Sequence, residues 1–161
     1  MIFLSPDMRP AERLAILETS ARHAATRDDV RELVRLVRSR LARSTETDTA
    51  RALLALVAAP PYPGNTPTTP GQWIDENVGA TVRDGGDCVD RTHALLALAF
   101  AAGLDGEAVW LLEPGELDHV APRLRSDGLW HWADALARPA MLGKAPQGSA
   151  WHTARGPVEL V

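Results

Sequence analysis

Apolar residues in the first third of the chain recur at the three- and four-residue spacing of amphipathic helices. The pattern is clearest over residues 30–41, where the apolar positions are Val30, Leu33, Val34, Val37 and Leu41. Residues three and four apart share one helix face, so this spacing predicts a helix with one buried side. Another helix is predicted before it, opened by Pro10, and a shorter one after it over residues 48–59.

Residues 60–72 break this pattern with several prolines, which exclude a regular helix or strand there. A segment of this kind can link two domains or form an ordered loop within one. We favour an ordered loop, because the Ala-rich helical part over residues 1–59 is too small to enclose a core alone. The 161 residues are therefore expected to form a single domain.

The second half of the chain changes to strand-like patterning. An apolar stretch over residues 92–102 is followed by Gly103, as in a buried helix with a glycine cap. Three strands are predicted after it, over residues 107–112, 117–125 and 129–133, with a turn at 113–116 and a hairpin turn at Asp127-Gly128. Helices followed by an antiparallel meander indicate an α+β fold. The Gly- and Pro-rich residues 147–161 are expected to form an extended tail laid over the domain.

Composition and charge narrow the class of protein. Apolar residues make up 45% and charged residues 24%, as in a soluble globular protein, and the net charge of -4 gives no support to nucleic-acid binding. The basic residues within 31–43 alternate with Leu and Val, which indicates the solvated face of a helix. No apolar run is long enough to span a membrane, and the N-terminus lacks the basic start of a secretory signal.

The single cysteine bears on location. Cys88 alone excludes an internal disulfide framework and fits a reducing compartment, so a cytoplasmic location is expected. Export by packaging into a larger particle needs no signal and stays open.

The sequence around Cys88 is the sharpest chemical feature of the chain. Residues 85–90, Gly-Gly-Asp-Cys-Val-Asp, lead directly into the predicted buried helix. At a helix N-terminus the free N–H groups stabilise a thiolate, and the amide of Cys88 can also stabilise an oxyanion on a substrate carbonyl. The two glycines would let a substrate backbone approach closely. A lone cysteine is usually an inert buried side chain, but acids on both sides are unusual neighbours for one.

A nucleophilic cysteine needs a base, and five histidines compete for that role. Four are poorly placed by their predicted elements: His23, His93, His131 and His152. His119 begins the second predicted strand, and counting across the Asp127-Gly128 hairpin puts it near Asp134, within a register error of about one or two residues. The carboxylate of Asp134 could then hold the imidazole in the tautomer that serves the thiol. Taken singly, each residue is more simply a surface side chain, and only their combination favours a site.

In this order the residues resemble the transglutaminase-like cysteine-enzyme superfamily. The resemblance rests on Gly86-Asp87-Cys88 before an apolar helix, Gly103, His119-Val120 in a strand, and Asp134 after Trp130 and Trp132. It covers residues 73–146 and implies a papain-like core, in which a central helix packs on an antiparallel sheet. It also implies Cys88 as nucleophile, His119 as general base and Asp134 as the residue that orients His119.

A narrower set of motifs is similar to the transglutaminase-like proteins of tailed phages and prophages. The set is Gly-Asp-Cys-x-Asp, the His-Val pair, an Asp after a Trp-containing strand, and Gly143 and Pro146 near the end of the core. This resemblance implies a phage or prophage context, with phage structural proteins as partners and incorporation into a phage-like particle.

The chain also departs from the superfamily pattern. Ala135 follows Asp134 where a proline is frequent, and Pro122 would put its strand at a sheet edge or kink it. No glutamine stands in the place of a papain-like oxyanion donor. The substitutes that the sequence offers are Gln72, Trp73 and Asn77.

Two functions are compatible with these residues. The first is a cysteine-dependent peptidase or amidase, or an acyl transferase, that acts on a peptide or protein substrate through a shared thioester intermediate. Hydrolysis is favoured, because an exposed thioester meets water by default. The alternative is a structural or adaptor component of a phage-like particle that keeps the fold. No cofactor and no metal are expected, since one cysteine with scattered histidines does not supply a zinc site and no calcium loop is present.

Overall fold

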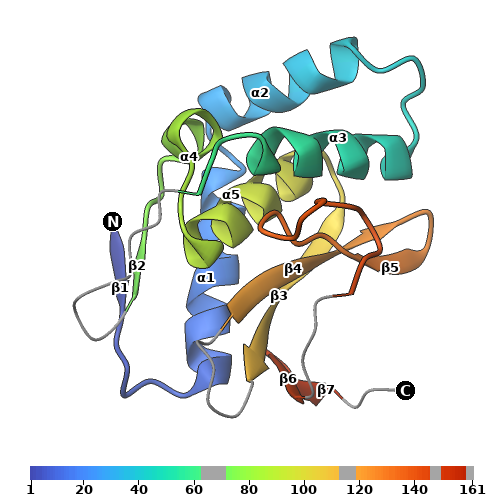
Figure 1. The fold of residues 1–161 in the computed structure, drawn as a ribbon. Coiled ribbons are helices and arrows are strands. Elements are labelled where there is room, and N and C mark those ends of the chain that lie inside the picture. Colours follow the sequence, from blue (N-terminus) through green and yellow to red (C-terminus); the bar gives the residue numbers. More distant parts are fainter. Residues whose placement is uncertain (63–71, 113–118, 146–149, 159–161) are drawn as a thin grey trace.

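Within the part of the chain that the structure describes, the helices lie in the first 101 residues and the strands of the main sheet follow them (Figure 1). The computed structural model describes residues 1–62, 72–112, 119–145 and 150–158. In these residues the helices are α1 (Pro10–Ala24), α2 (Asp28–Ser39), α3 (Glu46–Ala58), α4 (Val78–Asp84) and α5 (Cys88–Ala101). The strands are β1 (Ile2–Leu4), β2 (Gln72–Ile74), β3 (Asp105–Leu112), β4 (His119–Ser126), β5 (Leu129–Trp132), β6 (Ala150–Thr153) and β7 (Gly156–Val158). The predicted α+β class is confirmed. None of the described helices is long and apolar enough to cross a membrane.

Five strands form an antiparallel sheet in the order β5-β4-β3-β6-β7. β5 pairs only with the second half of β4, from Arg123 to Ser126. Past the end of β5 the amide of Ala133 donates to the carbonyl of Pro122 at 3.0 Å, so the chain continues alongside the first half of β4. Asp134 therefore lies next to the part of β4 that begins at His119.

Pro122 does not put β4 at a sheet edge. β4 lies between β3 and β5, and its pairing with β3 continues through Pro122, which is opposite Ala108. The Pro122 carbonyl points toward the β5 side, and in a strand the nitrogen of the same residue points that way too. The missing N–H therefore falls just past the end of β5 and interrupts no bond to β3.

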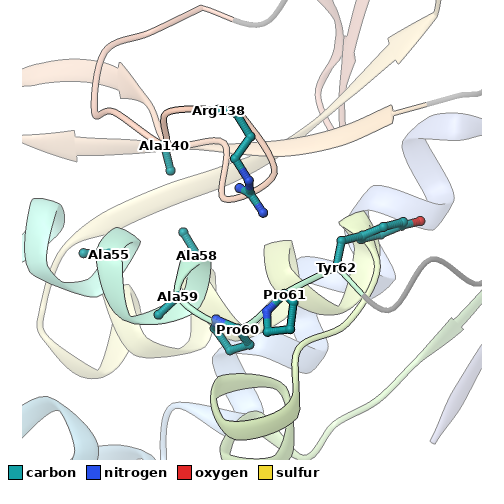
Figure 2. A pocket seen from close by; sticks show the side chains of 8 residues that line it. All are labelled: Ala55, Ala58, Ala59, Pro60, Pro61, Tyr62, Arg138 and Ala140. Carbon is teal, nitrogen blue, oxygen red and sulfur yellow. The ribbon is translucent and has the colours of Figure 1, made fainter.

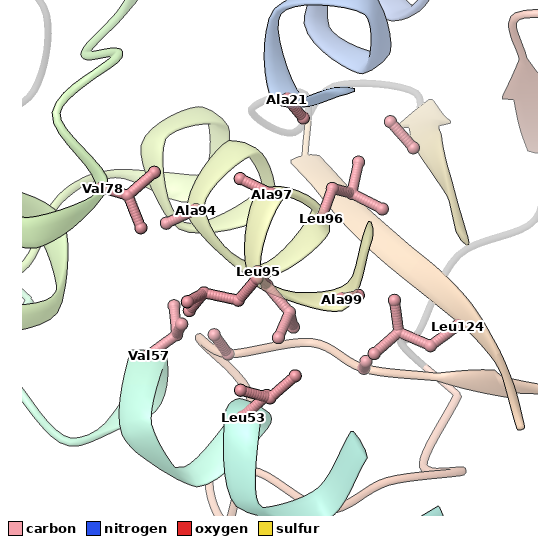
Figure 3. Close-up of a cluster of buried hydrophobic side chains, with 14 of the residues drawn as sticks. Ala21, Leu53, Val57, Val78, Ala94, Leu95, Leu96, Ala97, Ala99 and Leu124 are labelled. Carbon is pink, nitrogen blue, oxygen red and sulfur yellow. The ribbon is translucent and has the colours of Figure 1, made fainter. Parts of the chain in front are cut away.

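α5 is the centre of the hydrophobic core (Figure 3). Leu95, Leu96 and Leu98 each have 0% of their surface exposed. The side chains packed around α5 include Ala21 from α1, Leu53 and Val57 from α3, and Leu124 from β4. A helix that is apolar on every face has to be enclosed, so the helices of residues 1–59 and the sheet share one core with α5.

The structure differs from the sequence prediction at both ends of the chain. Residues 2–4 form β1 within the part predicted as helical, and β1 pairs with β2, with Ile2 opposite Ile74. The residues 147–161 predicted as an extended tail supply, in their described part, β6 and β7 of the sheet. Trp151 explains this, because it is buried and its ring packs on that of Trp132 with centroids 4.4 Å apart. The turn predicted at 113–116 and most of the proline-rich loop lie outside the described residues.

Candidate active site

The two glycines before Cys88 are required by the packing of their own turn. Gly85 has a φ of +86°, and a Cβ there would lie 2.6 Å from the carbonyl oxygen of Pro61. A Cβ on Gly86 would lie 2.6 Å from the Cβ of Asp90. Both positions therefore exclude a side chain for internal reasons, and the approach of a substrate is not needed to explain them.

Asp87 and Asp90 hold the N-terminus of α5 in a reciprocal capping arrangement. The Asp87 carboxylate accepts from the amides of Val89 and Asp90, at 2.8 and 2.9 Å. Asp90 accepts from the amide of Asp87 at 3.4 Å and from that of Asp75 at 2.9 Å. These bonds satisfy N–H groups that a helix start leaves unpaired. Cys88 is the half-buried first residue of α5, and its own amide donates to no group within the described residues.

The pKa of Asp90 is raised by its surroundings. Burial, followed by the negative charge of Asp87, raises the pKa of Asp90 to about 6, although the amides of Asp75 and Asp87 oppose the shift. Burial acts in this direction because a low-polarity environment disfavours the charged form. Asp90 therefore takes up a proton in mildly acid solution, where an ordinary carboxyl stays ionised.

His119 and Asp134, which counting across the hairpin placed close together, share a hydrogen bond. His119 Nε2 lies 2.8 Å from Asp134 Oδ2. The other carboxylate oxygen of Asp134 accepts from the amide of Leu136 at 2.9 Å, so the turn after β5 fixes the carboxylate. The Asp134 side chain is 10% exposed and the His119 side chain 27%. The carboxylate is thus shielded from water, while the ring remains accessible.

The His119 ring also interacts with Cys88. Burial lowers the pKa of His119, but hydrogen bonding to the side chains of Asp134 and Cys88, together with their charges, raises it to about 10. Burial acts on Asp134 in the opposite sense, and the hydrogen bond and charge of His119 outweigh it and lower the pKa of Asp134. The structure therefore joins His119 to Asp134 by a hydrogen bond, Cys88 is near enough to raise the pKa of the ring, and His119 is protonated at neutral pH.

A hydrogen bond between α5 and β4 joins these two elements close to Cys88 and His119. The hydroxyl of Thr92, one turn after Cys88, donates to the carbonyl of Val120 at 3.2 Å. Thr92 and Val120 are both buried. Because Val120 follows His119 directly, this bond fixes the start of α5 against the start of β4.

Arg91 is a further residue of this region, and no sequence motif marks it. It is 1% exposed. Its guanidinium donates to four backbone carbonyls, those of Gly86 at 2.9 Å, Val57 at 2.9 Å, Pro60 at 2.8 Å and Pro61 at 3.0 Å. These bonds tie the end of α3 and the segment after it to the turn before Cys88. An arginine at the start of a predicted buried helix is the one signal that could have pointed to this role.

His93, on the same helix as Cys88, has a different environment from His119. It has 0% of its surface exposed, and its Nε2 lies 2.9 Å from Ser20 Oγ. Burial is the main cause that lowers the pKa of His93 to about 4. His93 is therefore neutral at pH 7 and belongs to the packing between α1 and α5.

The residues suggested as a second oxyanion donor have other surroundings. Asn77 caps α4, with its carboxamide oxygen accepting from the amide of Ala80 at 3.0 Å. Trp73 is half exposed and its ring lies against that of Phe3, with centroids 4.8 Å apart. The side chain of Gln72 lies outside the described residues. Within the described ranges, no cluster of three or more His, Cys, Asp or Glu side chains is placed to hold a metal ion.

The sequence and the fold were compared with known proteins. No protein-family model matches the chain, and no curated protein matches it. Among solved structures, one described as a crystal structure of a TGase has a TM-score of 0.43 and 17% sequence identity over 89% of this chain. The match spans 36% of that longer chain. A likeness at this TM-score carries no conclusion about fold or activity.

Proposed function

We propose that the protein is a cysteine-dependent amide hydrolase or acyl transferase of the transglutaminase-like type, built on a papain-like core. Cys88 is the nucleophile, His119 the general base and Asp134 the residue that orients His119. The observation that carries the proposal is the 2.8 Å contact between His119 Nε2 and Asp134 Oδ2, on a ring that also interacts with Cys88. A nucleophile, its base and an acceptor that orients the base are the set of groups that acyl transfer requires.

The first half of the reaction forms a thioester. Asp134 occupies Nε2 of His119, so Nδ1 is the nitrogen left for the thiol. The raised pKa of His119 keeps the proton on the ring, and Cys88 attacks the substrate carbonyl as a thiolate. The C–S bond forms while the carbonyl oxygen becomes an oxyanion, which the free amide of Cys88 stabilises. The imidazolium then gives its proton to the leaving nitrogen as the C–N bond breaks.

The second half resolves the thioester. Water or an amine attacks the carbonyl carbon, and the now neutral His119 accepts the proton of the attacking group. The C–S bond breaks, and the sulfur leaves as the thiolate that began the cycle. Water gives an acid and makes the protein a peptidase or amidase, whereas an amine gives a new amide. We favour water, because the ring of His119 is accessible to solvent.

The biological setting rests on the sequence motifs alone. The Gly-Asp-Cys-x-Asp and His-Val motifs support a phage or prophage context with phage structural proteins as partners. In the same setting, a structural or adaptor role remains the alternative to catalysis, and the reactivity of Cys88 separates the two.

Alkylation of Cys88 tests the proposed function. Iodoacetamide should label the folded wild type rapidly at neutral pH and at about pH 5.5, because the proton already resides on His119. His119→Ala should slow labelling at the lower pH by about tenfold or more, and Asp134→Asn should slow it less, since the imidazole remains. His131→Ala, in a half-buried histidine of β5, is the matched control. Intact-mass spectrometry gives the rates, with Cys88→Ala as the blank.

Equal labelling rates for the wild type and His119→Ala would contradict an activated nucleophile. A thiol that reacts only after unfolding would favour the structural or adaptor role. If the thiol is activated, a glutamine-containing peptide with a fluorescent primary amine distinguishes the two chemistries: transfer incorporates the amine, and hydrolysis does not.

A further inference from the structure

A cavity of about 600 Å³ lies between the end of α3 and the loop after β5 (Figure 2). One wall is the end of α3, where Ala55, Ala58 and Ala59 present only methyl groups. Pro60, Pro61 and Tyr62 form the adjoining side, and Arg138 faces them from the loop after β5. The volume is within the range of about 300–1,000 Å³ that small-ligand sites occupy.

The walls of this cavity belong to the segments that hold Cys88 and Asp134. Arg91 binds the carbonyls of Pro60 and Pro61 and also that of Gly86, two residues before Cys88. On the other side, the Arg138 guanidinium donates to the carbonyls of Ala135 and Ala137, at 3.2 and 3.0 Å, in the turn that follows Asp134. The cavity is therefore built on the same segments that position Cys88 and Asp134.

The cavity is positively charged and has no counter-ion of its own. Neither Arg138 nor Arg91 forms an ion pair with a carboxylate in the described part of the chain. After burial, the charge of Arg138 is the next cause that lowers the pKa of Arg91, so the two guanidinium groups act on each other. Arg91 lies behind the lining, and apart from Arg138 every side chain that lines the cavity is Ala, Pro or Tyr. A carboxylate brought by a ligand would supply the missing negative charge.

We propose that the cavity is a subsite for a carboxylate of the peptide substrate, bound by Arg138. This inference rests on the proposed function and names its substrate class: peptides with an acidic group close to the amide that Cys88 attacks. Arginine suits this task because its planar guanidinium can donate two parallel hydrogen bonds to one carboxylate. The methyl-lined wall of α3 leaves space for the carbon chain that carries the group. An acidic side chain and a free peptide C-terminus are the two sources of such a carboxylate.

Peptide binding to the Cys88→Ala protein tests the subsite without any reaction. The probes are acetyl-Ala-Ala-Glu-Ala-Ala-amide, its Gln counterpart, and acetyl-penta-alanine with a free or an amidated C-terminus. Isothermal titration calorimetry should show one carboxylate-bearing peptide binding about tenfold more tightly than its neutral counterpart. A preference for the Glu peptide assigns the site to a side chain, and a preference for the free acid assigns it to a terminus.

Substitution at Arg138 tests whether this residue causes the preference for the carboxylate-bearing peptide. In the Cys88→Ala background, Arg138→Gln should abolish the preference and Arg138→Lys should keep part of it. Arg125→Gln, at an exposed arginine of β4, is the matched control and should keep all of it. Thermal unfolding of each variant shows whether a lost peptide preference comes from misfolding. If Arg138→Gln does not fold, the preference of Arg138→Lys is the test of the subsite.

Equal affinities within each peptide pair, no measurable binding of any peptide, or a preference that survives Arg138→Gln would overturn the subsite. These outcomes are independent of the alkylation test. An Arg138-dependent preference with an unreactive Cys88 would leave a carboxylate-binding site without the proposed catalysis. A reactive Cys88 without the preference would leave the catalysis and remove the subsite.

Discussion

Cys88 has an acid on either side, and both acids serve the helix that begins there. The Asp87 carboxylate accepts hydrogen bonds from two amides in the first turn of α5. The Asp90 carboxylate accepts hydrogen bonds from the amides of Asp87 and Asp75. The unusual neighbours that favoured a catalytic cysteine in the sequence thus have a structural explanation. The proposed function depends instead on the His119–Asp134 contact and on its proximity to the thiol.

The His119–Asp134 pair could be predicted because a tight turn sets the register between its strands. Asp127 and Gly128 both have positive φ, 50° and 80°, as the two-residue hairpin turn requires. Arg91 and Arg138 could not be predicted in this way. The sequence marks Arg91 only by its place at the start of a predicted buried helix, and it does not show that either arginine binds backbone carbonyls.

The raised pKa of His119 predicts that its ring stays protonated far above the usual range of histidine. In the wild type, the ring resonances should show no titration between about pH 6 and pH 9. Asp134→Asn removes the group whose hydrogen bond contributes most to raising the pKa, so the same resonances should titrate at lower pH. NMR titration of the ring measures both midpoints, and His119→Ala assigns the signals. A wild-type midpoint near 6.5 would contradict the prediction, because burial would then cancel the effects of the carboxylate and the thiol.

At the scale of elements, α5 could be predicted, whereas the strands near the two ends of the chain, β1, β6 and β7, could not. After its first turn, α5 has an unbroken apolar sequence over residues 94–101 that only a buried position accommodates. β1 and β6 contain three and four residues, too few for a clear alternation of apolar and polar positions. Their pairing partners are also distant in the chain, with Ile2 opposite Ile74 and Trp151 opposite Leu111.

The central position of α5 predicts a large stability loss when one of its leucines is shortened. Leu95→Ala should lower the free energy of unfolding by about 2–5 kcal/mol, because neighbours packed on several sides of α5 cannot collapse into the space. Urea unfolding measures the change. Leu36→Ala, on α2 at 41% exposure, is the control and should change stability by less than about 0.5 kcal/mol. Equal losses in the two variants would mean that α5 is not the centre of the core.

At the scale of the whole molecule, the candidate site is formed by segments that are distant in sequence. The start of α5 supplies Cys88, the start of β4 supplies His119, and the turn after β5 supplies Asp134. The N-terminal helices close the same core from the other side, and the end of α3 is bonded to Arg91. The change from helical to strand periodicity made the fold class predictable. β6 pairs with β3, which is distant in the chain, and β7 pairs with β6, so the expectation of an extended tail missed both strands.

The junction between the N-terminal helices and α5 contains a buried histidine that should make folding sensitive to acid. His93 has a pKa of about 4 in the folded protein, against an ordinary value of 6.5. Below about pH 6.5 the unfolded chain binds a proton at His93, whereas the folded chain does not until about pH 4. The free energy of unfolding therefore falls between these two pH values. The shift corresponds to about 3 kcal/mol over this window. Asp90 acts with the opposite sign, because its raised folded pKa of about 6 makes the folded chain bind a proton first as the pH falls.

Urea unfolding of the wild type, His93→Gln and Asp90→Asn at several pH values between about 7 and 4 separates these two contributions. At neutral pH, His93→Gln should be the less stable protein, because the packing and the contact with Ser20 are altered. As the pH falls, the wild type should lose the stabilisation that comes from a neutral His93, and the gap between the two proteins should narrow by about 3 kcal/mol. Asp90→Asn lacks the carboxyl that gains a proton on acidification. The free energy of unfolding of the wild type should therefore rise relative to that of Asp90→Asn over the same window. Parallel stability curves for the wild type and His93→Gln would show that His93 takes up its proton equally well in the folded and unfolded chain.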